Sequence, residues 1–287
     1  MLTSLILQLQ APAEANLPAN LGRAGQSLLL RLIGGREPAL AQELHQAERA
    51  RPYTVSNLVL GKRAGGSLHA QAGQSGWLRF TGLTEAVSRH LLALAQQPPE
   101  SVELDGYQFQ VSGATLDPAV HPWAGQITYQ DLAAPYLLGG RASPGSTLRL
   151  EFASPTTFRS QGRFLPLPQP ELVFGSLLDR WQTFAPIALH PDTRRFAAEA
   201  VVLSRYELRT RGMPYVKAGT RGGGEARSGG EQAGHYPTII GFTGRVIFAV
   251  LNRDRYWLNV LHLLAAFAFY SGVGYQTAAG LGQVRQI

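Results

Sequence analysis

The sequence predicts an α+β protein made of two tandem ferredoxin-like (RRM-like) βαββαβ domains, residues 1–138 and 147–287. Three observations lead to this fold. The chain has 287 residues, 45% of them hydrophobic, which is enough for two cores of ordinary size. Each half shows the same order of predicted elements, namely strand, helix, two strands, helix and strand. The turn-rich segment GGRASPGS at 139–146 separates the halves and is typical of a linker.

Hydrophobic periodicity places the elements of the first half. In order, they are a strand at 5–9, helices at 24–32 and 37–46, strands at 53–60 and 76–82, a helix from 84, and a hairpin over 102–111. Thr84 is expected to cap its helix, whose Val87, Leu91 and Leu94 form a stripe toward a core. Asp105-Gly106 is a typical two-residue hairpin turn.

The second half repeats this order. Its predicted elements are a strand at 148–153, a helix at 172–184, strands at 200–208 and 239–251, a helix at 255–270, and a last strand at 283–287. The helix at 255–270 has apolar residues at helical spacing, among them Trp257, Leu261 and Leu264. The order of elements therefore predicts a duplicated fold.

A cluster of glycines lies between the last predicted helix and the last strand. Gly272, Gly274, Gly280 and Gly282 allow positive φ angles and let an anion approach main-chain amides. A dinucleotide-binding fingerprint runs strand, loop, helix, and no Gly-Lys-Ser/Thr follows, so neither nucleotide motif fits. We predict that these amides bind a phosphate-rich polymer; the alternative is a turn that only ends the helix.

The cations of the chain are almost all arginines. The net charge is +7 and the isoelectric point is near 10.0, and only Lys62 and Lys217 are lysines among 26 cations. Because guanidinium groups bind phosphate bidentately and stack on bases, this composition favours an anionic partner. The arginines predicted to bind this anionic partner are Arg159, Arg163, Arg209, Arg211 and Arg285. For the first four, ordinary solvated arginines are an equally good interpretation.

The segment 219–234 contains seven glycines and no apolar run. It could be a flap that RNA orders. Because two arginines in it are matched by two glutamates, a disordered insertion in the strand hairpin is the favoured interpretation.

Catalytic chemistry is narrowed by the residues that are missing. The chain has no cysteine, no zinc-binding histidine spacing, no paired aspartates and no GxSxG motif, so we predict no metal site and no cofactor. Acid–base chemistry through histidine remains. His45 lies at the end of a predicted helix and precedes Arg49 and Arg51, a setting that suits a backbone phosphate. A surface histidine in a charged loop is at least as good an interpretation from sequence alone.

Location is predicted from two stretches of the chain. MLTSLILQLQ lacks the basic region and cleavage site of a secretory signal, and the longest apolar run, 260–270, is too short to span a bilayer. We expect a cytoplasmic protein without a membrane partner.

Three stretches resemble the CRISPR-associated repeat endoribonuclease family (Cas six): GVGYQTAAGLGQV, LHQAERARPYTVSNL and FRSQGRFLPLPQPELVFGSLLDRW. The resemblance covers nearly the whole chain and implies paired ferredoxin-like folds that bind CRISPR repeat RNA. It also implies metal-independent cleavage by the 2′-hydroxyl, leaving a 2′,3′-cyclic phosphate and a 5′-hydroxyl, and thereby the mature guide RNA. Subunits of a CRISPR effector complex are further possible partners.

The family's catalytic histidine matches His45, and Arg51 stands where relatives often have a basic catalytic lysine. A tyrosine that some members use on the first helix has no equivalent, because no tyrosine precedes Tyr53. Two alternatives stay open: a non-catalytic RNA-binding subunit of an effector complex, and a ferredoxin-like protein with a small-molecule ligand. The sequence also leaves open whether hairpin or single-stranded RNA is preferred.

Overall fold

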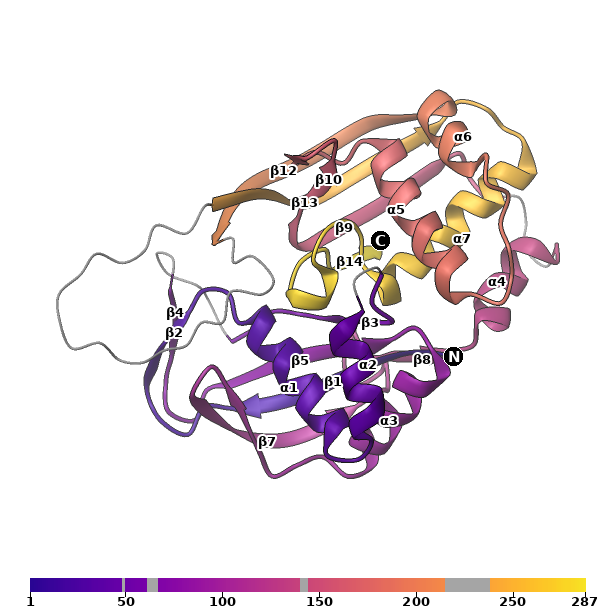
Figure 1. Cartoon of the computed structure of the whole chain (residues 1–287). Coiled ribbons are helices and arrows are strands. Elements are labelled where there is room, and N and C mark those ends of the chain that lie inside the picture. The colour runs from indigo at the N-terminus through magenta and orange to yellow at the C-terminus, as the bar shows by residue number, and fades with distance from the viewer. Residues whose placement is uncertain (48–49, 61–66, 140–143, 215–237) are drawn as a thin grey trace.

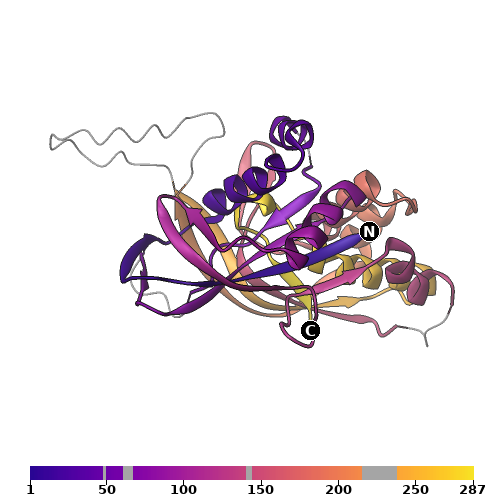
Figure 2. The same ribbon diagram turned by 90° about the horizontal axis from the view of Figure 1, so that it is seen from below.

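The structure, a computed structural model, describes residues 1–47, 50–60, 67–139, 144–214 and 238–287. Two antiparallel sheets lie one above the other in Figure 1, and helices cover one face of each. Figure 2 shows most of the helices on one side of the molecule and the strands of both sheets on the other. The glycine loop, defined here as residues 272–283, lies where the two halves meet (Figure 1).

The N-terminal sheet has the strand order β3-β5-β1-β7-β6, and β8 pairs with the free part of β1. Its strands are β1 (Leu2–Gln10), β3 (Tyr53–Val55), β5 (Ser75–Gly82), β6 (Ser101–Leu104), β7 (Tyr107–Thr115) and β8 (Gly125–Ile127). The helices of this half are α1 (Gly22–Gly34), α2 (Pro38–Gln46) and α3 (Glu85–Gln96). Asp105 and Gly106 have φ angles of 53° and 83°, so the predicted turn between β6 and β7 is confirmed.

The C-terminal sheet has the order β12-β13-β9-β14. Its strands are β9 (Thr147–Thr156), β12 (Val201–Pro214), β13 (Thr238–Val250) and β14 (Val284–Gln286), with helices α5 (Pro170–Phe184) and α7 (Arg255–Ser271). The four strands of the repeat are β1, β3, β5 and β7 in the N-terminal sheet, and β9, β12, β13 and β14 in the C-terminal sheet. In both sheets their spatial order is second, third, first, fourth. This shared order is the ferredoxin-like topology, and the predicted fold class is confirmed.

Several short elements were outside the prediction. They are β2 (Ala15–Pro18) with β4 (Ser67–Ala70), the hairpin β10 (Phe158–Ser160) with β11 (Arg163–Leu165), α4 (Tyr129–Leu137), α6 (Thr193–Ala200), and the single 3-10 turn η1 (Thr277–Ala279). The helices α4 and α6 have nine and eight residues, too few turns for a strong apolar period. The predicted insertion at 219–234, and Arg49, lie outside the described residues.

The predicted strand at 53–60 is only partly formed. Strand β3 ends at Val55, and Ser56 then makes a parallel bridge to Gly280 of the glycine loop. The Asn57 side chain bends the chain here, because its Oδ1 accepts from Leu21 N at 2.7 Å and its Nδ2 donates to Ala19 O at 3.0 Å. Thr84 does occupy the N-cap position of α3, but its side chain makes no capping hydrogen bond.

The buried apolar residues form two main cores, one for each sheet. The C-terminal core also takes in Tyr129 and Ala133 from α4, which packs on α7. Trp181 of α5 is fully buried and makes edge contacts with the rings of Tyr129 at 5.4 Å and Phe267 at 5.1 Å. Its Nε1 donates to Ile187 O at 2.6 Å. The last helix of the first half is thereby joined to the second core.

We expect Trp181→Ala to lower the free energy of unfolding by about 3–5 kcal/mol, since it leaves a large cavity and removes two aromatic contacts. Urea denaturation followed by fluorescence and circular dichroism measures this change. Tyr206→Ala, at a side chain with 63% exposure, is the control and should stay within about 0.5 kcal/mol. Equal effects of the two substitutions would contradict the described core.

Candidate functional site

Helix α7 leads directly into the glycine loop. Its N-terminus is capped by Asp254, whose carboxylate accepts from Tyr256 N at 2.8 Å and Trp257 N at 3.4 Å. Most of its length is buried on all sides, which explains its continuous apolar run. The helix ends because Gly272 has a φ of 63°, outside the helical region.

The four predicted glycines are required by backbone geometry. Their φ angles are all positive, at 63° for Gly272, 83° for Gly274, 94° for Gly280 and 68° for Gly282. A Cβ on Gly282 would lie 2.1 Å from Val273 O, and one on Gly274 would lie 2.5 Å from Thr157 O. The loop therefore folds back on itself and on β9, with no space for side chains at these positions.

The amides of the same glycines already have acceptors inside the protein. The donor–acceptor pairs are Gly272 N to Ala268 O (2.9 Å), Gly274 N to Ser176 Oγ (3.0 Å), Gly280 N to Val55 O (3.0 Å) and Gly282 N to Pro155 O (3.0 Å). Gly272, Gly280 and Gly282 are also buried. In this conformation these amides are hydrogen-bonded within the protein. RNA binding by Gly272, Gly274, Gly280 and Gly282 stays a prediction.

The glycine loop connects the two halves. Its Gly280 pairs with the edge of β3, and the turn η1 packs on both β3 and α1. At the closest point, a Cβ on Gly22 of α1 would lie 2.1 Å from Ala279 O. The first helix and the strand after Arg51 are therefore pressed directly against the loop.

His45 and Arg51 lie at the two ends of the segment that joins α2 to β3. His45 is in the last turn of α2 and is exposed, and the next described residues after the gap lead through Arg51 into β3. Arg51 Nη1 donates to the Tyr53 hydroxyl at 3.2 Å. Among the described residues Arg51 has no carboxylate partner.

Sequence reasoning did not identify the residues that orient Arg51. Gln26 of α1 donates through Nε2 to the same Tyr53 hydroxyl at 3.0 Å. Burial raises the pKa of the Tyr53 hydroxyl, and Arg51 and Gln26 oppose this shift, so the phenol stays protonated at neutral pH. Gln26 lies 27 positions before Tyr53, and no local pattern links the two residues.

Arg159 and Arg163 lie on the β10–β11 hairpin, and both are exposed. The turn between the strands has positive φ angles at Gln161 (49°) and Gly162 (76°). Phe164 of this hairpin packs on Tyr275 of the glycine loop, with 5.5 Å between ring centroids. The hairpin therefore holds its two arginines next to the loop.

Arg209 and Arg211 lie on β12 and are exposed as well. Alternate residues of a strand point to the same side, so both share a face with Met213. Met213 is buried against Leu281 of the glycine loop. The structure thus places four of the five predicted arginines on the β10–β11 hairpin and on strand β12, and both of these elements contact the glycine loop.

Arg285 has a different environment from the other predicted arginines. Its guanidinium pairs with Glu151 at 2.6 Å and lies over the Trp123 ring at 4.8 Å from the centroid. The side chain is 32% exposed. Strand β14 pairs with β9 in a register that puts Arg285 opposite Glu151. The ion pair was not expected from the sequence, and RNA binding by Arg285 stays a prediction.

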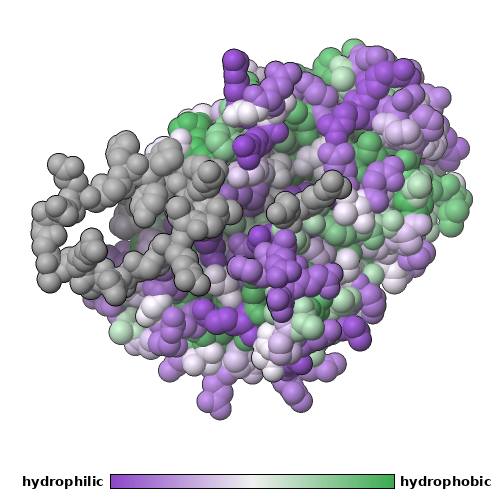
Figure 3. Space-filling view, in the orientation of Figure 1, coloured by the Kyte–Doolittle hydropathy of each residue, from purple (hydrophilic) through white to green (hydrophobic). Residues whose placement is uncertain are grey.

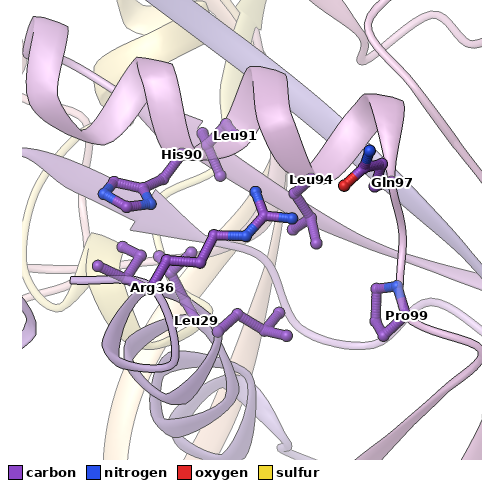
Figure 4. Close-up of a pocket in the computed structure, with 9 residues that line it drawn as sticks. Leu29, Arg36, His90, Leu91, Leu94, Gln97 and Pro99 are labelled. Atoms are coloured by element: carbon purple, nitrogen blue, oxygen red, sulfur yellow. The ribbon is translucent and has the colours of Figure 1, made fainter. Parts of the chain in front are cut away.

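A cavity of about 250 Å³ lies elsewhere, between α1 and α3 (Figure 4). Leucines form much of its wall, and Arg36, His90 and Gln97 line it from the two helices. None of the predicted site residues lines it. In Figure 3, hydrophilic residues cover much of both halves on the face seen in Figure 1, with apolar residues in smaller groups.

The described residues contain neither a cluster of possible metal ligands nor a helix that could span a membrane. No group of three or more His, Cys, Asp or Glu side chains in the described ranges could hold a metal ion. None of the helices in the described part of the chain is long and apolar enough to cross a membrane.

We expect Gly282→Ala to destabilise the protein by about 2 kcal/mol or more, because it adds a Cβ where φ is 68° and a carbonyl lies 2.1 Å away. Gly106→Ala is the matched control, with a φ of 83° and no atom within 4 Å of the added Cβ. It should cost about 1 kcal/mol, the strain of the positive φ alone. Thermal unfolding of both variants measures the difference. A Gly282 variant no less stable than the Gly106 variant would contradict the described packing of the loop.

Family descriptions match both halves of the chain. Residues 1–134 match the CRISPR Cas6 N-terminal domain, and residues 150–284 match CRISPR-associated endoribonuclease Cas6. Over 139 residues the chain is 28% identical to the CRISPR-associated endoribonuclease Cas6 of Mycobacterium tuberculosis, covering 48% of this chain and 38% of that protein. It is 26% identical over 136 residues to that of Streptococcus thermophilus, covering 47% and 48%. The chain thus aligns with less than half the length of each of these relatives.

Solved structures align over the full length. A Cas6 product complex superposes with a TM-score of 0.72 and 30% identity, covering 100% of this chain and 99% of the other. A product complex of Thermus thermophilus Cas6 gives a TM-score of 0.75 and 25% identity, with 100% of each chain covered. Two matched family descriptions and a full-length relative at 30% identity lead to one conclusion: the chain belongs to the CRISPR-associated Cas6 endoribonuclease family.

Proposed function

We propose that this protein is a metal-independent endoribonuclease that cleaves CRISPR repeat RNA to generate guide RNAs. One observation carries the proposal: the chain aligns over its full length, at 30% and 28% identity, with Cas6 solved as a product complex and as a substrate mimic complex. The arrangement beside the glycine loop supports it, since His45 and Arg51 come from the segment that precedes β3 and neither has an acidic partner among the described residues.

The proposed reaction is an internal transfer within the RNA. The 2′-hydroxyl attacks the adjacent phosphorus while its proton is removed, and the bond to the 5′-oxygen breaks as that oxygen gains a proton. The products are a 2′,3′-cyclic phosphate and a 5′-hydroxyl. His45 carries the proton transfer, because an imidazole exchanges protons near neutral pH. The exposed position of His45 at the end of α2 leaves its ring open to the substrate.

Arg51 has a different task in this scheme. A guanidinium stays protonated, so Arg51 cannot exchange protons and instead holds the charged scissile phosphate. The Tyr53 hydroxyl accepts from Arg51 and from Gln26, which fixes the position of the guanidinium relative to α1. Positioned acid–base catalysis contributes about 10²–10⁴-fold to such rates, and in-line alignment of the phosphate contributes a comparable or larger factor.

The RNA path follows from the position of the arginines. Arg159, Arg163, Arg209 and Arg211 are exposed on two hairpins that pack against the glycine loop. Guanidinium groups in such positions bind phosphates of an RNA backbone. The loop then serves RNA binding by holding these hairpins together. Arg285 supports the path from inside, through its ion pair with Glu151.

A non-catalytic RNA-binding subunit of an effector complex is the second candidate. The observation in its favour is the first helix, where no tyrosine is present and Gln26 takes the position next to the Tyr53 hydroxyl. Such a protein would bind repeat RNA and leave it intact. Cleavage under single-turnover conditions separates the two candidates.

His45→Ala is expected to reduce the single-turnover cleavage rate by about 10²–10⁴-fold, because the proton-transfer group is lost. Binding should change less than about threefold, since the proposed phosphate contacts are made by arginines and not by His45. The assay uses repeat RNA in EDTA, followed by analysis of the product ends. A repeat with a 2′-deoxy residue at the scissile site should bind and stay intact. Unchanged cleavage by the variant, or loss of wild-type cleavage in EDTA, would contradict this mechanism.

The double substitution Arg209→Gln with Arg211→Gln is expected to weaken RNA binding and flatten its salt dependence. Each lost phosphate contact should reduce the slope of log affinity against log salt by about 0.7–0.9. Arg253→Gln is the control, because Arg253 is exposed near the start of α7 and lies on neither hairpin. Titrations of fluorescent RNA at several salt concentrations give the slopes. Equal slopes for wild type and double variant would remove this strand from the RNA path.

A further inference from the structure

The carboxyl end of α7 is buried, and side chains satisfy its last carbonyls. Arg79 Nη2 donates to Phe269 O at 2.5 Å, and Thr81 Oγ1 donates to Tyr270 O at 2.8 Å. Arg180 donates to Ser271 O at 3.0 Å and to Gly274 O at 3.4 Å. The last carbonyls of a helix lack intrahelical donors and carry the negative end of its dipole. Two arginines and one threonine therefore meet a defined electrostatic need.

These contacts come from different halves of the molecule. Arg79 and Thr81 belong to β5 of the N-terminal sheet, whereas Arg180 belongs to α5 of the same half as α7. Arg79 and Thr81 thus tie the N-terminal sheet to the beginning of the glycine loop. Arg180 makes the equivalent contact without crossing between the halves.

Arg79 is buried at 3% exposure in a cage of aromatic rings. Its guanidinium lies 4.9 Å from the Trp123 ring centroid and 4.4 Å from that of Phe269. Its Nε donates to Ser4 Oγ at 2.7 Å. Among the described residues it has no carboxylate partner, and burial lowers the pKa of Arg79 to about 9, with Tyr270 opposing the shift.

Burying a cation without an acid is costly, and a leucine or methionine would fill this space at lower cost. The fork of the guanidinium provides what an apolar side chain cannot, since it bonds β1 and α7 at the same time. The backbone of Arg79 is also fixed, because it makes two hydrogen bonds to Ser56. Arg79 N donates to Ser56 Oγ at 2.8 Å, and Arg79 O accepts from Ser56 N at 2.9 Å. Ser56 directly follows β3.

A short path therefore connects Arg79 with the proposed catalytic segment. Strand β5 pairs with β3, and β3 begins at Tyr53, two residues after Arg51. On its other side, the Arg79 guanidinium holds the end of α7, which leads directly into the glycine loop (Figure 1). Through its backbone and its side chain together, Arg79 thus links the segment with His45 and Arg51 to the part of the protein proposed to hold RNA.

We propose that Arg79 is a positioning residue for RNA cleavage, which fixes the segment carrying His45 and Arg51 relative to RNA bound by the C-terminal half. This inference rests on the proposed function. Displacements of about 1 Å at a reacting centre cost on the order of 10²-fold in rate, so a small change between the halves is sufficient. Binding depends on arginines outside this contact and should be little affected.

Arg79→Met keeps the bulk of the side chain and removes its charge and donors. We expect the single-turnover cleavage rate at saturating RNA to fall by about 10–100-fold. The dissociation constant for a repeat with a 2′-deoxy residue at the scissile site should change less than about threefold. Arg79→Lys restores the charge and one donor, and its rate should lie between those of wild type and Arg79→Met.

Two controls separate positioning from loss of stability. Arg180→Met removes carbonyl contacts of the same kind within one half. Leu91→Ala removes a side chain with 1% exposure from the N-terminal core and should destabilise by about 2–5 kcal/mol. All rates are measured well below the lowest midpoint of thermal unfolding. If Leu91→Ala slows cleavage as much as Arg79→Met at a similar loss of stability, the proposal is wrong.

A distance measurement tests the proposal independently of activity. The chain has no cysteine, so spin labels can be attached at Gln96→Cys on α3 and Glu199→Cys on α6, both exposed and outside the proposed site. Arg79→Met should broaden or shift the distribution of distances between them, whereas Arg180→Met should not. An unchanged distribution together with wild-type cleavage overturns the proposal. A wild-type chain that binds but never cleaves overturns the proposed function, and with it any catalytic role for Arg79.

Discussion

Burial of the carboxyl end of α7 is the constraint on which the junction of the two halves depends. Its terminal carbonyls point into an apolar interface, where an unpaired polar group costs about 1–3 kcal/mol. The protein satisfies them with Arg79 and Thr81 from β5 of the N-terminal half and Arg180 from α5 of the C-terminal half. The chain must then leave the helix within a few residues, because β14 returns to pair with β9. Four positive φ angles in the glycine loop make this sharp return possible.

The loop is consequently a structural tie as well as a neighbour of the proposed RNA path. Its glycine amides donate to backbone carbonyls of β3 and of the end of β9, and to the Ser176 hydroxyl of α5, so the loop holds three elements together. Phe164 attaches the β10–β11 hairpin to the loop, and Met213 attaches strand β12. The exposed guanidinium groups of these two elements are the proposed ligands of the RNA phosphates.

Sequence periodicity was sufficient for the repeated fold, since the long helices and strands each bury one face and their spacing records it. Short elements are stabilised by residues far away in the sequence, so no local pattern predicted them. The β10–β11 hairpin, for example, packs through Phe164 on Tyr275. The pairing of Arg285 with Glu151 arises only from the register of β14 on β9, across 134 positions. Arg79 lies on the same face of β5 as Trp77 and Thr81. This face would be solvated if the N-terminal half were alone, so nothing in the local sequence indicated that Arg79 is buried.

The guanidinium groups at the junction also act together. Arg79 and Arg285 lie over the same Trp123 ring, and Glu151 is the carboxylate that pairs with Arg285. The end of α7 supplies about half an elementary charge and therefore offsets only part of the positive charge gathered there. In a weakly polarisable interior this remainder is screened less than surface charge, so it reaches the nearby surface.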